Sequence, residues 1–367
     1  MNLDILAVAL VTAVATSLIG VFLVLRKLSM MTDAIAHTVL LGIVLMFLWV
    51  RDLNSPWLVF GATLSGLFTV WLIETLRRVR FVKEDAAIGM VMTMLFSVAI
   101  LLLSTRLRRT HLHVETVLLG QLEFVMFERT TLPWIGSWPT SLVILSGVLV
   151  ANVLFLGFFY KEYKVLSFDR TLAHVLGFSP WLLHYLFMTL ISLTSVAAFN
   201  AVGAILVIAF MVGPVMSARL LTHRLPRLVA LTLIVAVFNT LMGYLIAFRW
   251  DLNTAASMAT MTLLSFLAIL IAAPKQGLLA RLWHHHQQTH TIHMLTLITH
   301  LKHHEQDDNV AVESNPNTLY EHFNWPQRKT QKLIHRSQKH GYIEQKDAII
   351  RVSPKGWQFY AHATRTL

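Results

Sequence analysis

The sequence predicts an all-α polytopic membrane protein that carries a small additional domain at its C-terminal end. Three observations support this fold class. Of the 367 residues, 56% are hydrophobic and 13% are charged, whereas an average soluble domain has about 25% charged residues. Nine apolar runs, each near the length that crosses a lipid bilayer, follow one another through residues 1–275. The remaining residues are polar, basic and rich in histidine.

The nine apolar runs are the first elements along the chain. They are apolar on all sides, as expected for helices that face lipid or other helices. The first run lacks a basic leading segment and a small-residue cleavage site, so we interpret it as a retained span and not as a signal peptide. We expect spans at about 4–25, 33–50, 56–76, 86–104, 138–160, 181–199, 201–218, 227–248 and 254–273.

Basic residues predict the orientation of these spans. Under the nine-span scheme, the cationic loops near residues 26–27, 77–83, 161–170, 219–227 and 275–281 all fall on one side. Short loops rich in Lys and Arg stay in the cytoplasm, so the N-terminus is expected outside and the C-terminal tail inside. The loop 105–137 also contains arginines, although the count places it outside. A short re-entrant or interfacial helix near 114–128 is one explanation, and the side of this loop stays open.

A carboxylate and an imidazole stand four residues apart at the start of the second run. Asp33 and His37 share one face of a helix, and ionisable side chains in a span usually mark a pathway or a binding site. The chain has no cysteine, so a metal site must use oxygen, nitrogen or thioether ligands, and this pair suits a divalent cation. A helix-capping Asp33 with a hydrogen-bonded His37 is the alternative, and periodicity does not decide between them.

Other polar residues in the spans are weaker candidates for the same site. Asn200 is the best of them, because it adjoins the Ala-Val-Gly turn at 201–203. His184 and Asn239 are expected to make hydrogen bonds between helices, which is the usual role of such residues in a span.

The segment 164–180 differs from a plain loop. Ser167 or Asp169 can cap a short helix, and Gly177 followed by Pro180 can end it. The alternative is a simple connector between two spans.

The polar C-terminal part is divided into two predicted segments. Residues 276–315 form a linker and helix with eight of the eighteen histidines, and residues 316–367 form a small domain. One interpretation of the early histidines is a regulatory metal site, and the other is a polar linker without ligand geometry. The metal interpretation assigns His284, His285, His286 and His290.

Residues 316–367 have the pattern of a winged helix-turn-helix-like domain. Helices are expected at 317–323 and 326–340, followed by a hairpin within 342–352. Arg328, Lys329 and Lys332 on the second helix could contact phosphates. Because the domain is tethered to a membrane protein, we favour a protein-interaction role and do not expect nucleic acid as the partner.

Residues 1–275 resemble the permease subunits of bacterial ABC importers for manganese, zinc and iron. The order and spacing of the matching stretches make this resemblance specific, although Thr32, Ala36, Leu41 and the segment 251–254 depart from the usual family pattern. The matching stretches are 25–42, 84–89, 118–122, 168–177 and 201–221.

The resemblance implies a type II ABC importer permease-like fold in the bacterial inner membrane. It implies that Asp33 and His37 contact the transported manganese, zinc or iron; Asn200 is the secondary candidate for this metal contact, with an interhelical hydrogen bond as its alternative role. It also implies an extracytoplasmic metal-binding protein and a second permease subunit in the lipid bilayer, either identical or related. The alternative function is a membrane-tethered metal-responsive regulator that acts through its tail.

The resemblance also identifies the segment 169–177 as a coupling helix that docks on a separate ATPase subunit. The implied contacts are Asp169, Arg170, Ala173 and Gly177. The chain contains no Gly-x-x-x-x-Gly-Lys-Ser/Thr loop. ATP hydrolysis is therefore expected from the partner, and the chain is expected to be a transport subunit with no enzymatic activity of its own.

Overall fold

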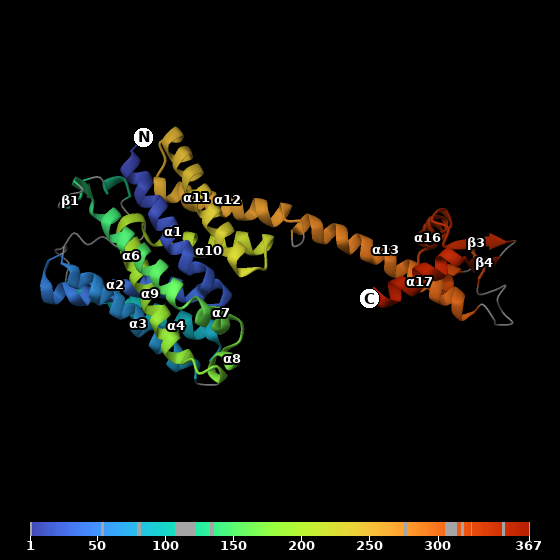
Figure 1. The fold of residues 1–367 in the computed structure, drawn as a ribbon, viewed down its shortest axis with the longest axis horizontal. Helices are drawn as coiled ribbons and strands as arrows, with labels where there is room; N and C mark the ends of the chain where they lie inside the picture. Colours follow the sequence, from blue (N-terminus) through green and yellow to red (C-terminus); the bar gives the residue numbers. More distant parts are fainter. Residues whose placement is uncertain are drawn as a thin grey trace. The chain divides into compact units, whose positions relative to one another are not determined.

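The computed structural model forms two compact units, Met1–Gly277 and Leu278–Leu367, which are described separately (Figure 1). The residues that the structure describes are 2–52, 55–78, 82–106, 122–125, 127–132, 136–274, 277–304, 314–316, 319–323, 325–346 and 349–366.

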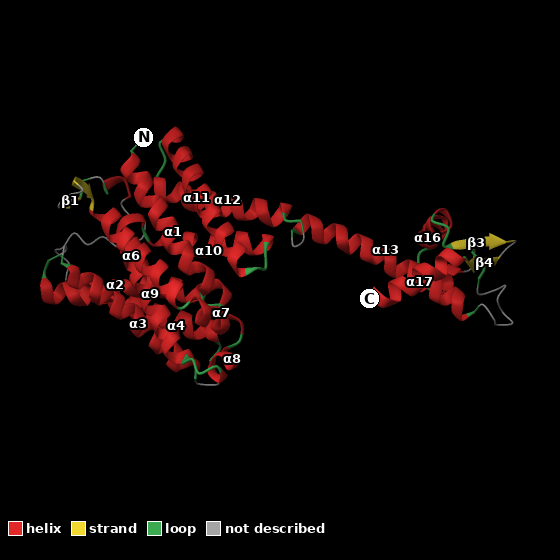
Figure 2. Ribbon diagram, in the orientation of Figure 1, coloured by secondary structure: helices red, strands yellow, loops and turns green. Residues whose placement is uncertain are grey.

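Within the described residues, nine helices of the first unit are long and apolar enough to cross a membrane, which confirms the predicted spans (Figure 2). The second begins one turn earlier than predicted. The nine helices are α1 Leu3–Leu25, α2 Ser29–Val50, α3 Pro56–Arg77, α4 Glu84–Arg106, α6 Thr140–Phe158, α9 Pro180–Val202, α10 Ala204–Leu221, α11 Leu225–Trp250 and α12 Thr254–Ala272.

Two short helices connect α6 to α9. The first, α7 (Tyr160–Phe168), follows α6 after a break of one residue and was not predicted. The second, α8 (Arg170–Val175), is the short helix expected within 164–180, so the plain-connector alternative is wrong. Tyr163 of α7 is fully buried, and its hydroxyl donates to the carbonyl of Leu183 in α9 at 2.5 Å.

The loop between α4 and α6 contains a small hairpin that the sequence did not predict. Strands β1 (Arg129–Leu132) and β2 (Gly136–Pro139) are antiparallel, with Leu132 opposite Gly136. Before them, the 3-10 turn η1 (Leu122–Phe124) is the described part of the predicted 114–128 helix, most of which lies outside the described residues.

Two contacts place this loop at one end of the unit. Arg129 pairs with Asp4 in the first turn of α1 at 2.5 Å, and Glu123 accepts a bond from the backbone N–H of Thr254 at 3.0 Å. The loop therefore lies at the end where α1 and α12 begin.

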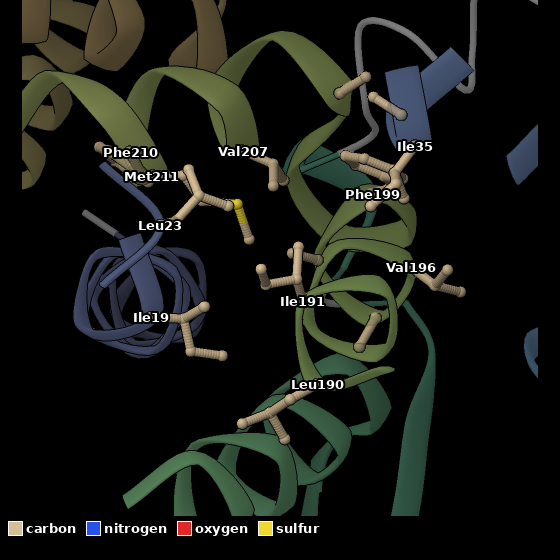
Figure 3. Packing of buried hydrophobic residues seen from close by; sticks show 14 of the residues in the cluster. Ile19, Leu23, Ile35, Leu190, Ile191, Val196, Phe199, Val207, Phe210 and Met211 are labelled. Atoms are coloured by element: carbon tan, nitrogen blue, oxygen red, sulfur yellow. The ribbon is translucent and has the colours of Figure 1, made fainter. Parts of the chain in front are cut away.

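Helix α1 lies at the centre of the first unit and packs against α6, α9, α10 and α11. Its contact with α10 depends on Gly20, because a Cβ there would sit 2.1 Å from the carbonyl oxygen of Met211. Small residues allow two membrane helices to approach this closely. Figure 3 shows Ile19 and Leu23 of α1 beside Phe210 and Met211 in this core.

A proline adjusts the same interface. Pro214 lies inside α10 and cannot donate a hydrogen bond to the carbonyl of Phe210, four residues earlier. Ser17 of α1 donates to that carbonyl at 2.8 Å. The Phe210 carbonyl, which lacks its usual partner within the helix, thus accepts a hydrogen bond from the neighbouring helix, as the dry interior of a membrane requires.

A buried amide links three helices elsewhere in the bundle. Asn152 of α6 is fully buried and donates to the carbonyl of Ala15 in α1 at 3.3 Å and to the hydroxyl of Thr194 in α9 at 3.1 Å. Such bonds between membrane helices contribute about 0.6 kcal/mol each on average. They specify which helices are neighbours more than they stabilise the bundle.

The second unit contains α13 Leu278–His303, α15 Leu319–His322, α16 Gln327–Lys339, the antiparallel strands β3 Ile343–Lys346 and β4 Ile349–Val352, and α17 Pro354–Thr366. Leu297, Leu301, Leu319, Leu333 and Ile350 form its core. The order of helices and hairpin follows the prediction, and α17 is additional. Because α13 packs against α16, β4 and α17, the helix of the predicted linker is part of this unit. The winged-helix assignment stays a prediction.

Candidate functional site

The acid–histidine pair lies one helical turn inside α2. The N-cap of this helix is Leu28, and the helix begins at Ser29, so Asp33 does not cap it. The helix-capping alternative is therefore wrong. The Nε2 atom of His37 lies 3.6 Å from Oδ1 of Asp33, close enough for an ion pair when the imidazole is protonated.

One side of this pair is open. The side chains of His37 and Asp33 are 30% and 47% exposed, whereas Ala34, Ile35 and Thr38 around them are buried. On the covered side, the His37 ring packs edge to face on Phe96 of α4, with centroids 5.4 Å apart. In the described residues, no three His, Cys, Asp or Glu side chains gather as a metal site. The pair can supply two ligands, and among the described residues no further His, Cys, Asp or Glu side chain joins it.

The structure does not join Asn200 to this pair. Asn200 lies in the last turn of α9 and is exposed, and within the described residues no hydrogen bond links it to Asp33 or His37. Its role as a metal contact stays a prediction. Asn239 of α11 is fully buried, and its amide has no hydrogen-bond partner among the described residues, so the expected interhelical bond is not formed.

His184 makes the interhelical contact that was expected of it, and it also makes a second one. Its Nδ1 atom lies 2.8 Å from a guanidinium nitrogen of Arg26, and its Nε2 atom lies 2.6 Å from Oε1 of Glu74. The other carboxylate oxygen of Glu74 accepts a bond from the Tyr185 hydroxyl at 2.8 Å. The side chains of His184 and Glu74 are 6% and 18% exposed. Arg26, Glu74, His184 and Tyr185 are called the ionic cluster below.

The sequence contained only a partial signal for the ionic cluster. Glu74 and His184 are 110 positions apart, and neither belongs to a local motif. The available signal was an acidic residue close to the end of a predicted span, a position that is costly for a charge without a partner.

Helix α8 is short and is capped at both ends by the residues that the sequence identified. Oδ1 of Asp169 accepts two backbone N–H bonds from the first turn, at 2.8 and 3.0 Å. At the other end, Gly177 has a φ of +85°, and the amide of Phe178 donates to the carbonyl of Ala173 at 3.1 Å. This is a Schellman ending, which favours glycine.

Helix α8 and its C-cap expose three large apolar side chains beside the polar Thr171 and His174. Leu172, Val175 and Leu176 are 46%, 79% and 54% exposed, whereas Ala173 on the opposite face is buried. The side chain of Arg170 lies outside the described part of the chain. An exposed apolar patch of this kind usually marks a contact with a membrane or another protein.

The predicted basic contacts of the C-terminal unit share one pocket. Arg328, Lys329 and Lys332 line a pocket of ≈ 460 Å³ together with His293. The Lys329 ammonium lies 2.9 Å from Nε2 of His293 and 4.9 Å from the centre of the Trp325 ring. The pocket is therefore lined by several cationic side chains, which suits an anionic group.

The side chains of His284, His285, His286 and His290 lie outside the described part of the chain, so a metal role for them stays a prediction. The histidines that the structure does bring together come later. The ring centroid of His300 lies 4.7 Å from that of His304 and 5.6 Å from that of His322.

Comparisons with known proteins identify relatives of this chain. Residues 2–273 match the ABC 3 transport family. The zinc transport system membrane protein TroD of Treponema pallidum is 35% identical over 356 residues, which covers 97% of each chain. The manganese transport system membrane protein MntD of Bacillus subtilis is 38% identical over 277 residues, covering 76% of this chain and 94% of the relative.

A solved structure has the same arrangement of helices. PsaBC from Streptococcus pneumoniae, in complex with Fab, superposes with a TM-score of 0.63 at 27% identity, covering 75% of this chain and 92% of that one. The match to TroD extends over the C-terminal unit, whereas the matches to MntD and PsaBC cover about three quarters of the chain. Nine predicted spans, a family match over nearly all of them and a shared fold lead to one assignment: the chain belongs to the ABC 3 transport family.

Proposed function

We propose that this protein is the transmembrane subunit of an ATP-driven importer that moves manganese, zinc or iron across the bacterial inner membrane. The observation that carries the proposal is the Asp33–His37 pair on α2, one turn inside a membrane helix and open on one side. Carboxylate and imidazole together suit divalent transition metals. The relatives named above are zinc and manganese transport proteins.

The open side of the pair supports a second permease subunit. Two ligands from each of two subunits would provide four around one ion, and a symmetric dimer brings identical residues together at its axis. A transported ion must also leave its site, so a shell completed only between two subunits suits transport better than a closed cage within one. The second subunit is either a copy of this chain or a related permease.

A separate ATPase subunit is the proposed partner of α8. The exposed Leu172, Val175 and Leu176 of α8 and its C-cap provide apolar contacts for such a partner. The chain itself has no phosphate-binding loop, so ATP would be bound by the partner. In this arrangement α8 and the C-terminal unit lie in the cytoplasm, and an extracytoplasmic metal-binding protein delivers the ion at the other end. Transport is favoured over the tethered-regulator alternative because the relatives named above are transport-system proteins.

Uptake of radiolabelled manganese, zinc and iron into proteoliposomes tests the proposal. The vesicles contain this subunit with its ATPase, and the metal-binding protein is added outside. Asp33→Asn and His37→Gln should each abolish ATP-dependent uptake while the complex still assembles. Asp251→Asn is the matched control, because Asp251 has a φ of +52° and asparagine tolerates that conformation. Normal uptake by both pair variants would refute the assignment of the site.

A further inference from the structure

Short chain segments connect the ionic cluster to both the Asp33–His37 pair on α2 and the proposed ATPase-docking helix α8. It joins the turn before α2, the end of α3 and the start of α9, through contacts of 2.6 to 2.8 Å. Its four members come from three separate parts of the sequence, and the His184 imidazole at its centre is buried. Contacts on either side of the cluster lead to the metal pair on α2 and to the coupling helix α8.

A tight turn at Arg26–Leu28 connects the ionic cluster to the helix that carries the metal pair. Arg26 caps the end of α1, and Lys27 follows with a φ of +59°. The amide of Leu28 donates to the carbonyl of Leu23 at 3.0 Å, which completes a Schellman ending without glycine. Helix α2 begins at the next residue, and Asp33 lies about 6 Å further along its axis. A displacement of Arg26 therefore moves the start of α2.

The connection between α8 and the start of α9, where His184 and Tyr185 lie, is also short. Only Gly177 to Ser179 and the C-cap separate the last turn of α8 from Pro180, the first residue of α9. Close to this junction, the Tyr163 hydroxyl donates to the carbonyl of Leu183, immediately before His184. Burial raises the pKa of Tyr163 above its ordinary value, so this hydroxyl keeps its proton and remains a donor.

The cluster has the properties of a link that moves as one body. Arg26 contacts α9 at two successive turns, because its guanidinium also lies 5.4 Å above the ring of Phe187. Glu74 likewise holds both His184 and Tyr185. The Arg26 guanidinium and the Glu74 carboxylate contact opposite nitrogens of the buried His184 ring. Separating either charge from the ring removes a polar partner in a low dielectric, which is unfavourable. When the start of α9 moves, Arg26 and Glu74 are therefore expected to move with it, because breaking their contacts to α9 is unfavourable.

We propose that the ionic cluster is the mechanical link that carries ATP-driven movement of α8 to the metal pair on α2. Its members are positioning residues: they touch neither the metal nor the ATPase but fix the start of α2 to the start of α9. This inference rests on the proposed function, because it assumes metal transport by Asp33 and His37 and ATPase docking on α8.

The first test removes the charge and keeps the shape. Glu74→Gln should leave ATP hydrolysis by the assembled complex in place but lower the metal transported per ATP by a factor within about 5 to 150, the usual range of coupling between sites. Glu84→Gln is the matched control, because the Arg77–Glu84 pair, at 2.9 Å, belongs to the same end of the bundle but is 36% and 40% exposed. Exposed pairs contribute little, so this variant should remain coupled.

The second test replaces the ionic link with a covalent one. The chain has no cysteine, so Glu74→Cys combined with His184→Cys introduces the only two thiols. This double variant should be uncoupled, and joining the thiols with a short bis-thiosulfonate reagent should restore metal uptake until a reductant removes the bridge. A purely structural role for the cluster would not produce this reversible rescue.

The outcomes separate the two proposals. If Glu74→Gln and a second variant, His184→Gln, both transport as much metal per ATP as the unmodified protein, the link is refuted and the transport assignment stands. If cross-linking the double variant does not restore uptake, a fixed connection between α3 and α9 is not what coupling needs, and the inference is equally refuted. If the unmodified protein moves no metal with its ATPase, it is the proposed function that fails.

Discussion

Replacing Gly177 by alanine is a sharp test of how α8 acts. This helix has only six residues, Arg170–Val175, and a helix of that length has little intrinsic stability. Its shape therefore depends on the Asp169 cap at one end and on the left-handed Gly177 at the other. Gly177→Ala weakens the second of these and leaves the exposed apolar surface unchanged.

The magnitude follows from the local geometry. Among the described residues, no atom lies within 4 Å of a Cβ built on Gly177, so alanine neither clashes with these neighbours nor gains a contact from them. The remaining effect is the conformational cost of the backbone, because an L-residue in a left-handed conformation costs about 1–2 kcal/mol. A change of that size shifts the equilibrium between the formed and the opened turn by a factor of roughly 5 to 30.

The assay measures ATP-dependent metal uptake and co-purification of the ATPase subunit. Both should fall in Gly177→Ala, and Gly177→Asn should retain more of each because asparagine tolerates a left-handed backbone. Gly147→Ala in α6 is the matched control, since its Cβ also has no neighbour within 4 Å in the described part of the chain, but its backbone is helical. The reasoning is refuted if Gly177→Ala binds the ATPase and transports metal as well as Gly147→Ala does.

Three further outcomes are expected. Deleting 169–177 should abolish uptake while the protein still inserts in the membrane, which membrane fractionation would verify. Gly20→Val should prevent close packing on Met211, where the added Cβ would sit 2.1 Å from a carbonyl oxygen, and should lower the melting temperature of the detergent-solubilised protein. Because burial raises the pKa of Tyr163, the neutral side chain stabilises the fold below its unfolded pKa of about 10, and this contribution is lost at higher pH. The melting temperature should therefore fall less steeply above that pH in Tyr163→Phe than in the unmodified protein.

Much of the bundle could be predicted because lipid imposes a local rule. A membrane helix must satisfy its backbone hydrogen bonds internally and present apolar side chains over a fixed length. Each span can therefore be identified from its own residues, and the nine predicted runs correspond to nine helices in the described structure. The caps of α8 were predictable for the same reason, because Asp169 and Gly177 act on backbone groups within a few residues of themselves.

The candidate site was only partly predictable. Asp33 and His37 share a face because of helical spacing alone, but which face the bundle leaves open depends on where α4 packs. Whether Asp33 is a cap depended on where α2 begins, and the turn at Arg26–Leu28 sets that start one turn earlier than the apolar run suggested.

By itself, the sequence determined the class of protein, its spans, the spacing that puts Asp33 and His37 on one face of α2, and the capped helix α8. The tertiary structure alone decided that Glu74 meets His184 and Arg26, that the hairpin β1–β2 contacts the start of α1, and that Gly20 lies against Met211. The physical reason is the distance along the sequence over which each kind of interaction acts. Helical periodicity and capping act over a few residues, whereas these contacts join segments up to 191 positions apart, as Gly20 and Met211 are. Their pairing depends on how whole helices pack, and no local pattern encodes it.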